Sequence, residues 1–398
     1  MGEQKAMTIK GNMATAMGAK LCRPNVIPAY PITPSTLFPE KMSEFVADGE
    51  LDASMINVES EHSAMSACIG ASATGARVCT ASASQGVALM HEMLFVASGM
   101  RLPIVMAVGN RALSAPINIW CDHQDTMASR DSGWLQFYAE NNQEGLDLVI
   151  NAFRIGEDER VLLPVMVGID AFVLTHTIEG VMVPAQEDVD DFLPSYRSPQ
   201  GTLDPKEPAT FGSFGTPEYY QEFKQAQVDA IDISRKVIDE VFEEFEDRFG
   251  RKYNKITTYD CEDADIILLT MGSMTGTARE SIKKLRSEGK KVGLIKLTVF
   301  RPFPIQELTN VLTDVRGVAV IDRNISPGGF GAVYSDLAAS FANHKNRPIM
   351  KNFIVGLGGR EVFVKNFEEI YEKTKQAVDA GEVNQSIEWM NVNKDVLE

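Results

Sequence analysis

Residues 58–70 read VESEHSAMSACIG. This stretch places Glu59 and Glu61 at the start of a run of small residues that has the composition of a buried helix. Burying a carboxylate is costly unless another group pairs with it. Strand-like segments lie on both sides, and this alternation of strand, loop and helix predicts an α/β sheet. Ligands of such sheets bind beyond the carboxyl ends of the strands.

Two other polar residues follow predicted strands and are expected at the same edge as Glu61. Thr33 lies in a Pro-Ile-Thr-Pro turn, whose prolines restrict the backbone. Arg111 follows 103–110, the most strand-like segment of the chain. An acid, a hydroxyl and an arginine are therefore candidates for one pocket. Each also has a plainer interpretation: Glu61 as a helix N-terminal charge, Thr33 as a turn-capping residue and Arg111 as half of a surface ion pair.

Residues 8–183 are predicted to form repeated β–α units. Helices are expected over 11–21, from Ser35 as N-cap, and over 60–74, 86–99 and 142–154. Strands are expected over 26–32, 53–59, 77–83, 103–110 and 161–170. The intervening stretch 111–132 has no clear periodicity, and a loop of this length inside a compact domain is usually functional.

The rest of the chain divides into a linker and a second α/β region. Residues 184–216 are rich in proline and glycine and are predicted to be a linker or arm, followed by a long amphipathic helix over 217–249 packed on one face. Strands are then expected at 264–273, 291–297 and 317–323, with helices at 274–288, from 304 and after 326–333, and a last helix with a loose tail in 361–398. The expected domains are 1–183, 184–260 and 261–398.

Composition excludes several classes of protein. The 398 residues carry 55 acidic against 38 basic side chains, a net charge of -17, which argues against binding nucleic acid or an anionic membrane. The five cysteines are scattered without a CxxC motif, so neither a disulfide framework nor a complete iron–sulfur site is expected. No apolar stretch approaches the ~20 residues of a membrane span, and Met1–Lys10 lacks a signal-peptide core. We expect a cytoplasmic protein.

Other chemistries have weak support in the sequence. His62 and the DHQD segment (122–125) offer metal-ligand types, but their spacing is not that of a metal site, and we predict no metal in this chain. The turn SPGGFG (326–331) lacks the order of a nucleotide-binding loop, so close backbone packing is the better interpretation. There is no nucleophile elbow, which leaves hydrolase chemistry without support.

The motifs together resemble those of a known family. They are AYPITPST, VESEHSA, TASASQG, HEMLFVASGMRLPIVM, GNRALSAP and DHQDTMASRDSGW, followed by TMGSMTGT, VFRPFP and FIVGLGGR. In this order they resemble the alpha subunits of four-subunit pyruvate:ferredoxin oxidoreductases (pyruvate synthases), within the 2-oxoacid:ferredoxin oxidoreductase family. The resemblance implies a pyrimidine-type thiamine-diphosphate-binding domain, a parallel sheet with helices on both faces, plus a transketolase C-terminal-like α/β domain.

The same resemblance implies an activity and a set of partners. The enzymes of this family oxidise pyruvate to acetyl-CoA and CO₂ while reducing ferredoxin, or run the reverse synthesis. The Gly-Asp-Gly…Asn signature that holds Mg²⁺ and the diphosphate is missing from this chain. Thiamine diphosphate is therefore expected to be shared with a partner, with Mg²⁺ and the iron–sulfur clusters on the beta, gamma and delta subunits and coenzyme A as a substrate.

Site residues follow from the same resemblance, position by position. Glu61 matches the family's activating glutamate, which faces N1′ of the aminopyrimidine. Thr33 matches the threonine beside the substrate, and Arg111 the arginine that binds the carboxylate leaving as CO₂. Pro31, Ile32 and Gln85 are expected to help bind the cofactor. Two alternatives stay open: a branched-chain 2-oxoacid (2-oxoisovalerate) oxidoreductase subunit, and a non-catalytic assembly subunit.

Overall fold

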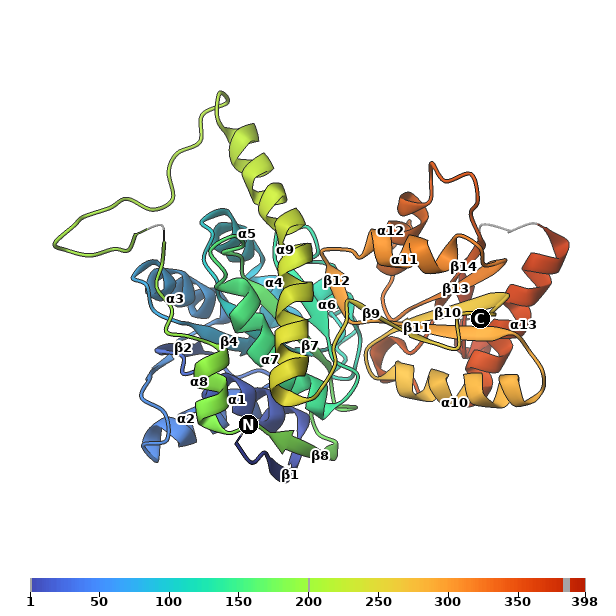
Figure 1. Cartoon of the computed structure of the whole chain (residues 1–398), viewed down its shortest axis with the longest axis horizontal. Helices are drawn as coiled ribbons and strands as arrows, with labels where there is room; N and C mark the ends of the chain where they lie inside the picture. Colours follow the sequence, from blue (N-terminus) through green and yellow to red (C-terminus); the bar gives the residue numbers. More distant parts are fainter. Residues whose placement is uncertain (1, 200, 382–386, 398) are drawn as a thin grey trace.

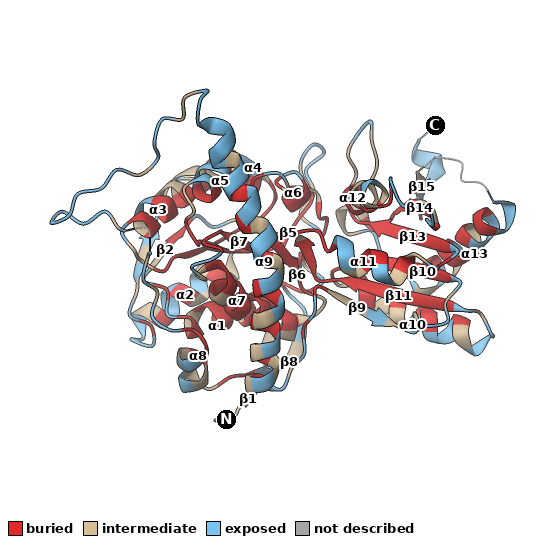
Figure 2. Cartoon of the chain, turned by 45° about the horizontal axis from the view of Figure 1, so that its top comes forward, coloured by how far each residue is buried: buried red, intermediate tan, exposed pale blue. Residues whose placement is uncertain are grey.

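The computed structural model describes residues 2–199, 201–381 and 387–397. It contains two α/β units, drawn on the left and on the right of Figure 1, each built on a largely parallel sheet. Buried residues fill both sheets and the helix faces that cover them (Figure 2). The mixed α/β fold class with parallel sheets, predicted from the sequence, is confirmed.

The N-terminal unit is built on a sheet whose central strands are fully buried. All residues of β5 and β7 are buried, as is typical of parallel strands covered by helices on both faces. The strand order is β12-β6-β7-β5-β4, and β2 with β3 extends it through a parallel bridge between Val26 and Val78. The strands are β2 (Val26–Ala29), β3 (Ser54–Asn57), β4 (Cys79–Ser82), β5 (Val105–Asn110), β6 (Leu135–Tyr138) and β7 (Val165–Asp170). The helices are α1 (Gly11–Leu21), α2 (Leu37–Ala47), α3 (Glu61–Ala73), α4 (Ser84–Leu89), α5 (His91–Gly99), α6 (Gln124–Met127) and α7 (Asn142–Gly156).

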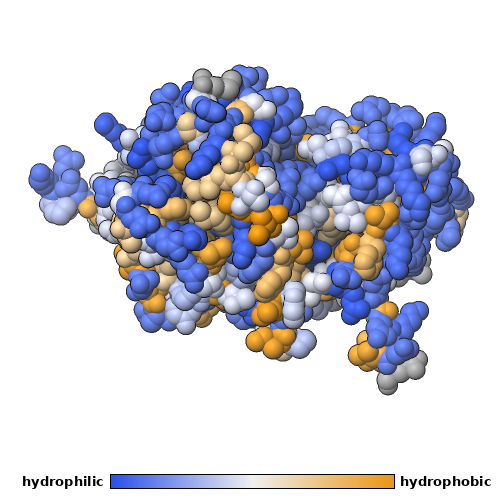
Figure 3. Space-filling view, turned by 90° about the horizontal axis from the view of Figure 1, so that it is seen from below, coloured by the Kyte–Doolittle hydropathy of each residue, from blue (hydrophilic) through white to orange (hydrophobic). Residues whose placement is uncertain are grey.

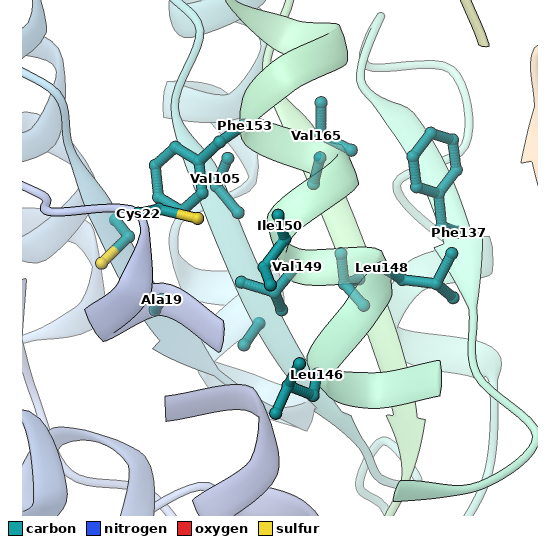
Figure 4. Packing of buried hydrophobic residues seen from close by; sticks show 14 of the residues in the cluster. Ala19, Cys22, Val105, Phe137, Leu146, Leu148, Val149, Ile150, Phe153 and Val165 are labelled. Atoms are coloured by element: carbon teal, nitrogen blue, oxygen red, sulfur yellow. The ribbon is translucent and has the colours of Figure 1, made fainter. Parts of the chain in front are cut away.

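Successive side chains of β5 enter two separate cores, one on each face of the sheet. Val105 and Ala107 pack in a cluster that includes residues of α1 and α7, whereas Met106 and Val108 belong to a cluster with residues of α3 and α5. This alternation is the period of two that strand geometry imposes. Figure 4 shows part of the first core, where the labelled side chains of α7 lie among those of α1, β5 and β7.

Most predicted elements of this unit are confirmed, with strands a few residues shorter than expected. The helix predicted over 11–21 is α1, and that over 142–154 is α7. The helix predicted over 60–74 is α3, which begins at Glu61 because the Ser60 side chain caps it by accepting a hydrogen bond from the Ser63 amide.

Two expectations for this unit are wrong. The single helix predicted over 86–99 is divided into α4 and α5 at the buried Met90, whose ψ of 5° departs from helical geometry. Ser35 does not cap the second helix, because its hydroxyl donates instead to the Ser82 carbonyl, and α2 begins at Leu37.

An antiparallel pair, β1 (Lys5–Lys10) and β8 (Ile178–Val183), places Lys5 opposite Val183 and was not predicted from the sequence. Strand β6 was not predicted either. In the segment expected to be a linker or arm, the short helix α8 (Gln186–Phe192) packs on the N-terminal unit through Val189 and Phe192. A long stretch of chain between α8 and α9 leaves the body of the molecule in Figure 1.

The long helix α9 (Tyr220–Phe249) confirms the amphipathic prediction from Gln227 onward, where one face is buried. Val237, Val241 and Phe245 are buried in the first core. Tyr220 and Phe223 are exposed, and the first turns of α9 project from the unit in Figure 1. From Gln227 onward, one face of α9 therefore packs on the N-terminal unit, as predicted.

The C-terminal unit repeats the same architecture. Its sheet has the order β15-β14-β13-β10-β11-β9, in which only β9 is antiparallel. Ile267 and Leu269 of β10 face a core with α11 and α12, whereas Ile266 and Leu268 face α10 and α13. The strands are β9 (Ile256–Tyr259), β10 (Ile266–Met271), β11 (Val292–Leu297), β12 (Val299–Arg301), β13 (Gly317–Asp322), β14 (Ile349–Ile354) and β15 (Glu388–Trp389). The helices are α10 (Met274–Ser287), α11 (Ile305–Leu312), α12 (Ala332–Ser340) and α13 (Val364–Ala380), with short 3₁₀ turns at Leu357–Gly359 and Lys394–Val396. The last predicted helix is α13, and part of the predicted tail (382–386 and 398) lies outside the described residues.

The two units are joined by backbone strand pairing and by a shared hydrophobic core. Strand β12 leaves the C-terminal unit and pairs antiparallel with β6, placing Val299 opposite Phe137. Met127 and Tyr138 of the N-terminal unit pack in the same core as β10 and β13. Both contacts join distant parts of the chain, and neither could be predicted from local sequence patterns.

The face seen from below in Figure 3 is mostly hydrophilic, with separate patches of hydrophobic residues. Among the described residues, no helix is both long enough and apolar enough to span a membrane.

Candidate functional site

The loops that follow β2, β4 and β5 meet at one edge of the N-terminal sheet. These strands are parallel, so their carboxyl ends lie on the same side. Ser35 fixes this arrangement: its hydroxyl donates to the Ser82 carbonyl at 2.8 Å and accepts from the Gly109 amide at 3.1 Å. The turn that contains Thr33 is thereby tied to the ends of β4 and β5.

Glu61 is the first residue of α3, and its side chain is only 7% exposed. Its carboxylate points toward α4, because a Cβ on Gly86 would lie 2.7 Å from Oε1 and 2.4 Å from the Ser82 hydroxyl. Among the described residues, neither carboxylate oxygen of Glu61 has a hydrogen-bond partner, and both oxygens remain accessible from outside, whereas the Ser82 hydroxyl is fully buried without a partner. The helix N-terminus favours the charge, but the buried carboxylate still has unused hydrogen-bonding capacity.

Arg111 is held by two backbone carbonyls. Its Nε donates to the Asn118 oxygen and its NH1 to the Thr33 oxygen, both at 2.9 Å. Burial lowers the pKa of the guanidinium, while the nearby Asp125 opposes that shift. The NH2 nitrogen has no hydrogen-bond partner among the described residues, which leaves one end of the fork able to donate to an anion.

These contacts argue against the plainer interpretation of Arg111, and its role in binding a carboxylate stays a prediction. Among the described residues its side chain has no acidic partner, and it is 7% exposed, so it is not half of a surface ion pair. The structure instead joins Arg111 directly to the turn that carries Thr33.

Asp125 organises this edge of the sheet, a role that sequence analysis did not assign. Its fully buried carboxylate accepts hydrogen bonds from the Ser84 amide at 2.9 Å and the Arg111 amide at 3.0 Å. It also accepts from the Asn110 side chain and from its neighbour Thr126. One carboxylate therefore binds together the start of α4 and the end of β5. The only signal in the sequence was an acid in a long loop without periodicity.

The remaining predicted residues lie at the open side of this edge. Pro31 and Thr33 are exposed, whereas Ile32 and Gln85 are half-buried. Gln85 accepts a hydrogen bond from the Ser84 hydroxyl, and the Thr33 hydroxyl has no partner among the described residues. Pro31, Ile32 and Thr33 belong to the loop after β2, and Gln85 belongs to α4. The roles of these four residues stay predictions.

His62 does not contribute to the site. Its Nε2 lies 3.0 Å from Glu92 Oε1 of α5, in an exposed contact. Although His62 follows Glu61 in sequence, the two side chains lie in different surroundings, because consecutive residues of a helix do not face each other.

Cys121, His123 and Asp170 form a buried group whose ligand atoms lie within 4.8 Å of one another. Arg323 already occupies this group, donating to Cys121 Sγ at 3.0 Å and to Asp170 at 2.7 Å. Burial alone would raise the pKa of Asp170, but His123 and Arg323 outweigh it and hold that pKa well below its usual range. The group is therefore an ion pair between the two units.

The glycine-rich turn 326–331 packs closely, as predicted, only at its last residue, because no atom lies within 4 Å of a Cβ built on Gly328. A Cβ on Gly331 would lie 2.1 Å from Asp322 Oδ2. Asp322 accepts from the amides of Val333 and Tyr334, at the start of α12. A side-chain carboxylate thus takes the position that a phosphate would occupy at a helix N-terminus.

Comparisons with known proteins agree with this architecture. Residues 17–243 match the family model described as "Pyruvate flavodoxin/ferredoxin oxidoreductase, thiamine diP-bdg", and residues 264–367 match "Pyruvate:ferredoxin oxidoreductase core domain II". The pyruvate synthase subunit PorA of Pyrococcus furiosus is 55% identical over 98% of both chains. That of Methanothermobacter thermautotrophicus is 49% identical over 97% of this chain and 98% of its own. The ketoisovalerate oxidoreductase subunit VorA of Pyrococcus horikoshii is 48% identical over 97% and 98%.

Solved structures resemble the fold at lower identity. A 2-oxoglutarate:ferredoxin oxidoreductase from Magnetococcus marinus, with 2-oxoglutarate, coenzyme A and succinyl-CoA bound, superposes with a TM-score of 0.72 at 20% identity. The match covers 94% of this chain and 65% of that longer chain. A split-gene transketolase matches with a TM-score of 0.52 over 94% of this chain and 99% of its own.

The predicted thiamine-diphosphate-binding fold is confirmed by the family model, and the curated relatives are matched over nearly their whole length. This chain belongs to the pyruvate flavodoxin/ferredoxin oxidoreductase family, and its N-terminal unit is the thiamine-diphosphate-binding domain of that family.

Proposed function

We propose that this chain is the PorA-type alpha subunit of a pyruvate synthase. The complex oxidatively decarboxylates pyruvate to acetyl-CoA and CO₂ and reduces ferredoxin, or catalyses the reverse synthesis. The observation that carries the proposal is the buried carboxylate of Glu61, left without a partner at an edge that also holds Arg111, in a chain 55% identical to PorA relatives.

The residues of this edge fit the pyrimidine end of thiamine diphosphate. Glu61 offers a buried carboxylate with unused hydrogen-bonding capacity, and Gly86 leaves the space beside it free of any Cβ. Pro31, Ile32 and Gln85 complete the side of the pocket that this chain supplies. Bound thiamine diphosphate supplies a carbanion-stabilising centre for decarboxylating 2-oxoacids.

Each of the three central residues has a role in this proposal. Glu61 holds and exchanges a proton at N1′ of the aminopyrimidine ring, acting as a positioned acid–base group. Arg111 donates through its free NH2 end to the substrate carboxylate. Thr33 presents its hydroxyl to the same end of the substrate.

We also keep the expected division of the chain, with 1–183 as the pyrimidine-binding domain, 184–260 as arm and long helix, and 261–398 as the transketolase C-terminal-like domain. The diphosphate and Mg²⁺ are assigned to a beta subunit, and the iron–sulfur clusters to other subunits of the complex, with gamma and delta chains completing it. Coenzyme A accepts the acyl group. The cytoplasmic location stays a prediction.

Two observations favour a pyruvate-specific enzyme over the two alternatives, a 2-oxoisovalerate enzyme and a non-catalytic subunit. Within one organism, Pyrococcus horikoshii, the PorA subunit is 55% identical to this chain and the VorA subunit 48%, which favours pyruvate over 2-oxoisovalerate. A purely structural assembly subunit has no need of an unpaired carboxylate at the same sheet edge as an arginine with a free NH2 group.

The test is to purify the native complex, identify its chains by mass spectrometry and assay methyl-viologen reduction with pyruvate and with 2-oxoisovalerate. We expect a multi-subunit complex whose kcat/KM is higher for pyruvate. A higher kcat/KM for 2-oxoisovalerate would show that the chain belongs to a branched-chain 2-oxoacid oxidoreductase. Isolation of an inactive single-chain assembly would contradict both the pyruvate and the branched-chain assignment.

A further inference from the structure

A loop of the C-terminal unit contacts the loop that holds Arg111. The Asn118 Nδ2 donates to the Gly358 carbonyl at 3.0 Å, and the Gly359 amide donates to the Cys121 carbonyl at 2.7 Å. The Gly358 amide donates in turn to Asp122 at 3.3 Å. Three hydrogen bonds thus join the 3₁₀ turn at Leu357–Gly359 to one short stretch of the N-terminal unit.

Two glycines make this close approach possible. Gly358 has φ +59°, and a Cβ there would lie 2.6 Å from Asn118 Nδ2. Gly359 has φ +78°, and a Cβ there would lie 2.3 Å from Trp120 Cβ. Any larger residue would push the two loops apart, because real Cβ contacts are not this short.

Asn118 is the residue at which this contact reaches the candidate site. Its backbone oxygen accepts from Arg111 Nε at 2.9 Å, while its side-chain oxygen accepts from the Trp120 amide at 2.8 Å. The backbone oxygen and the side-chain oxygen of Asn118 therefore accept hydrogen bonds within the loop, and its side-chain nitrogen donates one across the interface.

Beyond Asn118 the loop is anchored to its own unit, because the Ala112 amide donates to the Trp120 carbonyl at 3.1 Å and Arg111 forms an antiparallel bridge with Cys121. The stretch before Asn118 is open. Residues 114–117 are exposed, and Ile117 is 80% exposed. The second anchor of Arg111, the Thr33 carbonyl, belongs to the N-terminal unit. The Asn118 side chain is thus held by the Trp120 amide within its own unit and by the Gly358 carbonyl of the C-terminal unit, and its backbone carbonyl lies between these contacts and Arg111.

We propose that Asn118 is a positioning residue through which the C-terminal unit fixes the orientation of the Arg111 guanidinium. The inference rests on the proposed role of Arg111 in binding the 2-oxoacid carboxylate. It gives the C-terminal unit a part in substrate recognition without any contact to the substrate, because a fork held at both Nε and NH1 presents its free end in one direction.

The test is steady-state kinetics of Asn118→Ser in the complete complex. The serine hydroxyl can still accept from the Trp120 amide but is too short to reach the Gly358 carbonyl. We expect the KM for pyruvate to rise about 3- to 10-fold, the effect of one uncharged hydrogen bond. The kcat and the KM for coenzyme A should stay within about twofold of wild type, because a loosened arginine weakens binding of the carboxylate.

Gln124→Ala is the matched control. Gln124 Oε1 accepts from the Ile325 amide at 3.0 Å, which is another hydrogen bond between the two units but does not lead to Arg111. Its loss should leave the KM for pyruvate unchanged. An equal rise in KM for both variants would overturn the inference, because it would indicate general loosening of the interface.

The double variant Arg111→Ala/Asn118→Ser separates failure of this inference from failure of the proposed function. If Asn118 acts through Arg111, its substitution has no further effect on kcat/KM once the arginine is gone. If Arg111→Ala lowers kcat/KM and Asn118→Ser alone does not, the positioning role is wrong and the proposed function stands. If Arg111→Ala itself has wild-type kinetics, the positioning role and the proposed role of Arg111 are both overturned, while the preference of the complex for pyruvate still tests the proposed function separately.

Discussion

Each α/β unit carries a buried carboxylate near the carboxyl ends of its parallel strands, and the two have opposite surroundings. Asp322 ends β13 and accepts from the amides of Val333 and Tyr334 and from the Asn352 side chain. Glu61 begins α3, and among the described residues its oxygens accept no hydrogen bond.

The two carboxylates differ in their internal hydrogen bonds, and this difference separates a structural carboxylate from one that can bind a ligand. Burial of an acid is costly, and most buried polar groups recover that cost through internal hydrogen bonds. Asp322 does so and therefore belongs to the fold. The oxygens of Glu61 accept no hydrogen bond within the described residues but remain accessible from outside, and Gly86 keeps the space beside them free of a Cβ. We infer that the partner of Glu61 comes from outside this chain.

The largest expected difference between the two carboxylates is in enzyme turnover when each is replaced by its uncharged amide. Glu61→Gln should lower turnover of the complex by ~10²-fold or more, the scale of losing a positioned acid–base group, with cofactor still bound. Asp322→Asn should leave turnover per folded enzyme near wild type. Steady-state assays with cofactor occupancy measured on the same preparations test both. Similar activity losses in the two variants would remove the distinction.

Arg111 extends the comparison to substrate binding. Arg111→Ala removes a charge-assisted contact worth ~1.5–3 kcal/mol, so kcat/KM for pyruvate should fall roughly ten- to hundred-fold. Arg111→Lys should recover only part of this loss, because an ammonium lacks the fork geometry. Kinetics on both variants decide the point, and full recovery by lysine would show that charge alone is sufficient.

The glycines beside the two carboxylates sharpen the comparison. Gly86→Ala places a methyl group against Glu61 and Ser82, so activity should fall about tenfold as the carboxylate is displaced, with the fold retained. Gly331→Ala presses on Asp322 instead and should lower the thermal unfolding midpoint while activity per folded enzyme persists. Calorimetry and assays on both variants separate the effects, and an exchange of these two outcomes would contradict our account.

The smallest effect concerns pH. Burial raises the pKa of Asp322 to about 6, despite hydrogen bonds from Val333 and Tyr334 that oppose the shift. The folded state then binds this proton more tightly than the unfolded state, whose ordinary aspartate pKa is about 4. The free energy of unfolding should therefore fall as pH rises from about 4 to about 6, by at most about 1.4 kcal/mol for each pH unit.

Asp322→Asn removes this dependence, so the variant should gain stability relative to wild type over the same interval. Unfolding midpoints measured by scanning calorimetry at several pH values provide the test. A stability difference that does not change with pH would mean that Asp322 titrates like an ordinary aspartate.

Local patterns predicted the elements that local physics determines. The β5 run 103–110 and the helices α1 and α7 follow from hydrophobic periodicity and a few capping residues. The parallel order of the strands then brought Thr33 and Arg111 to one edge, as expected. The break at Met90 was missed, because a buried methionine carries no local helix-breaking signal.

What the sequence could not predict depends on contacts between distant residues. Pairing of β12 with β6 joins residues more than 150 positions apart, and no propensity encodes it. Asp125 offered only an acid in a loop, and its hydrogen bonds to Ser84 and Arg111 appear only once the strands are in place. The same holds for the Asn118 contact with Gly358.

The most direct test of the central claim is proton exchange at C2 of the bound thiamine, followed by NMR after an acid quench of the complex. We predict that Glu61→Gln slows this exchange by ~10²-fold or more with the cofactor still bound, while Asp322→Asn exchanges at the wild-type rate. A wild-type exchange rate in Glu61→Gln would contradict our account and return Glu61 to the role of a helix N-terminal charge.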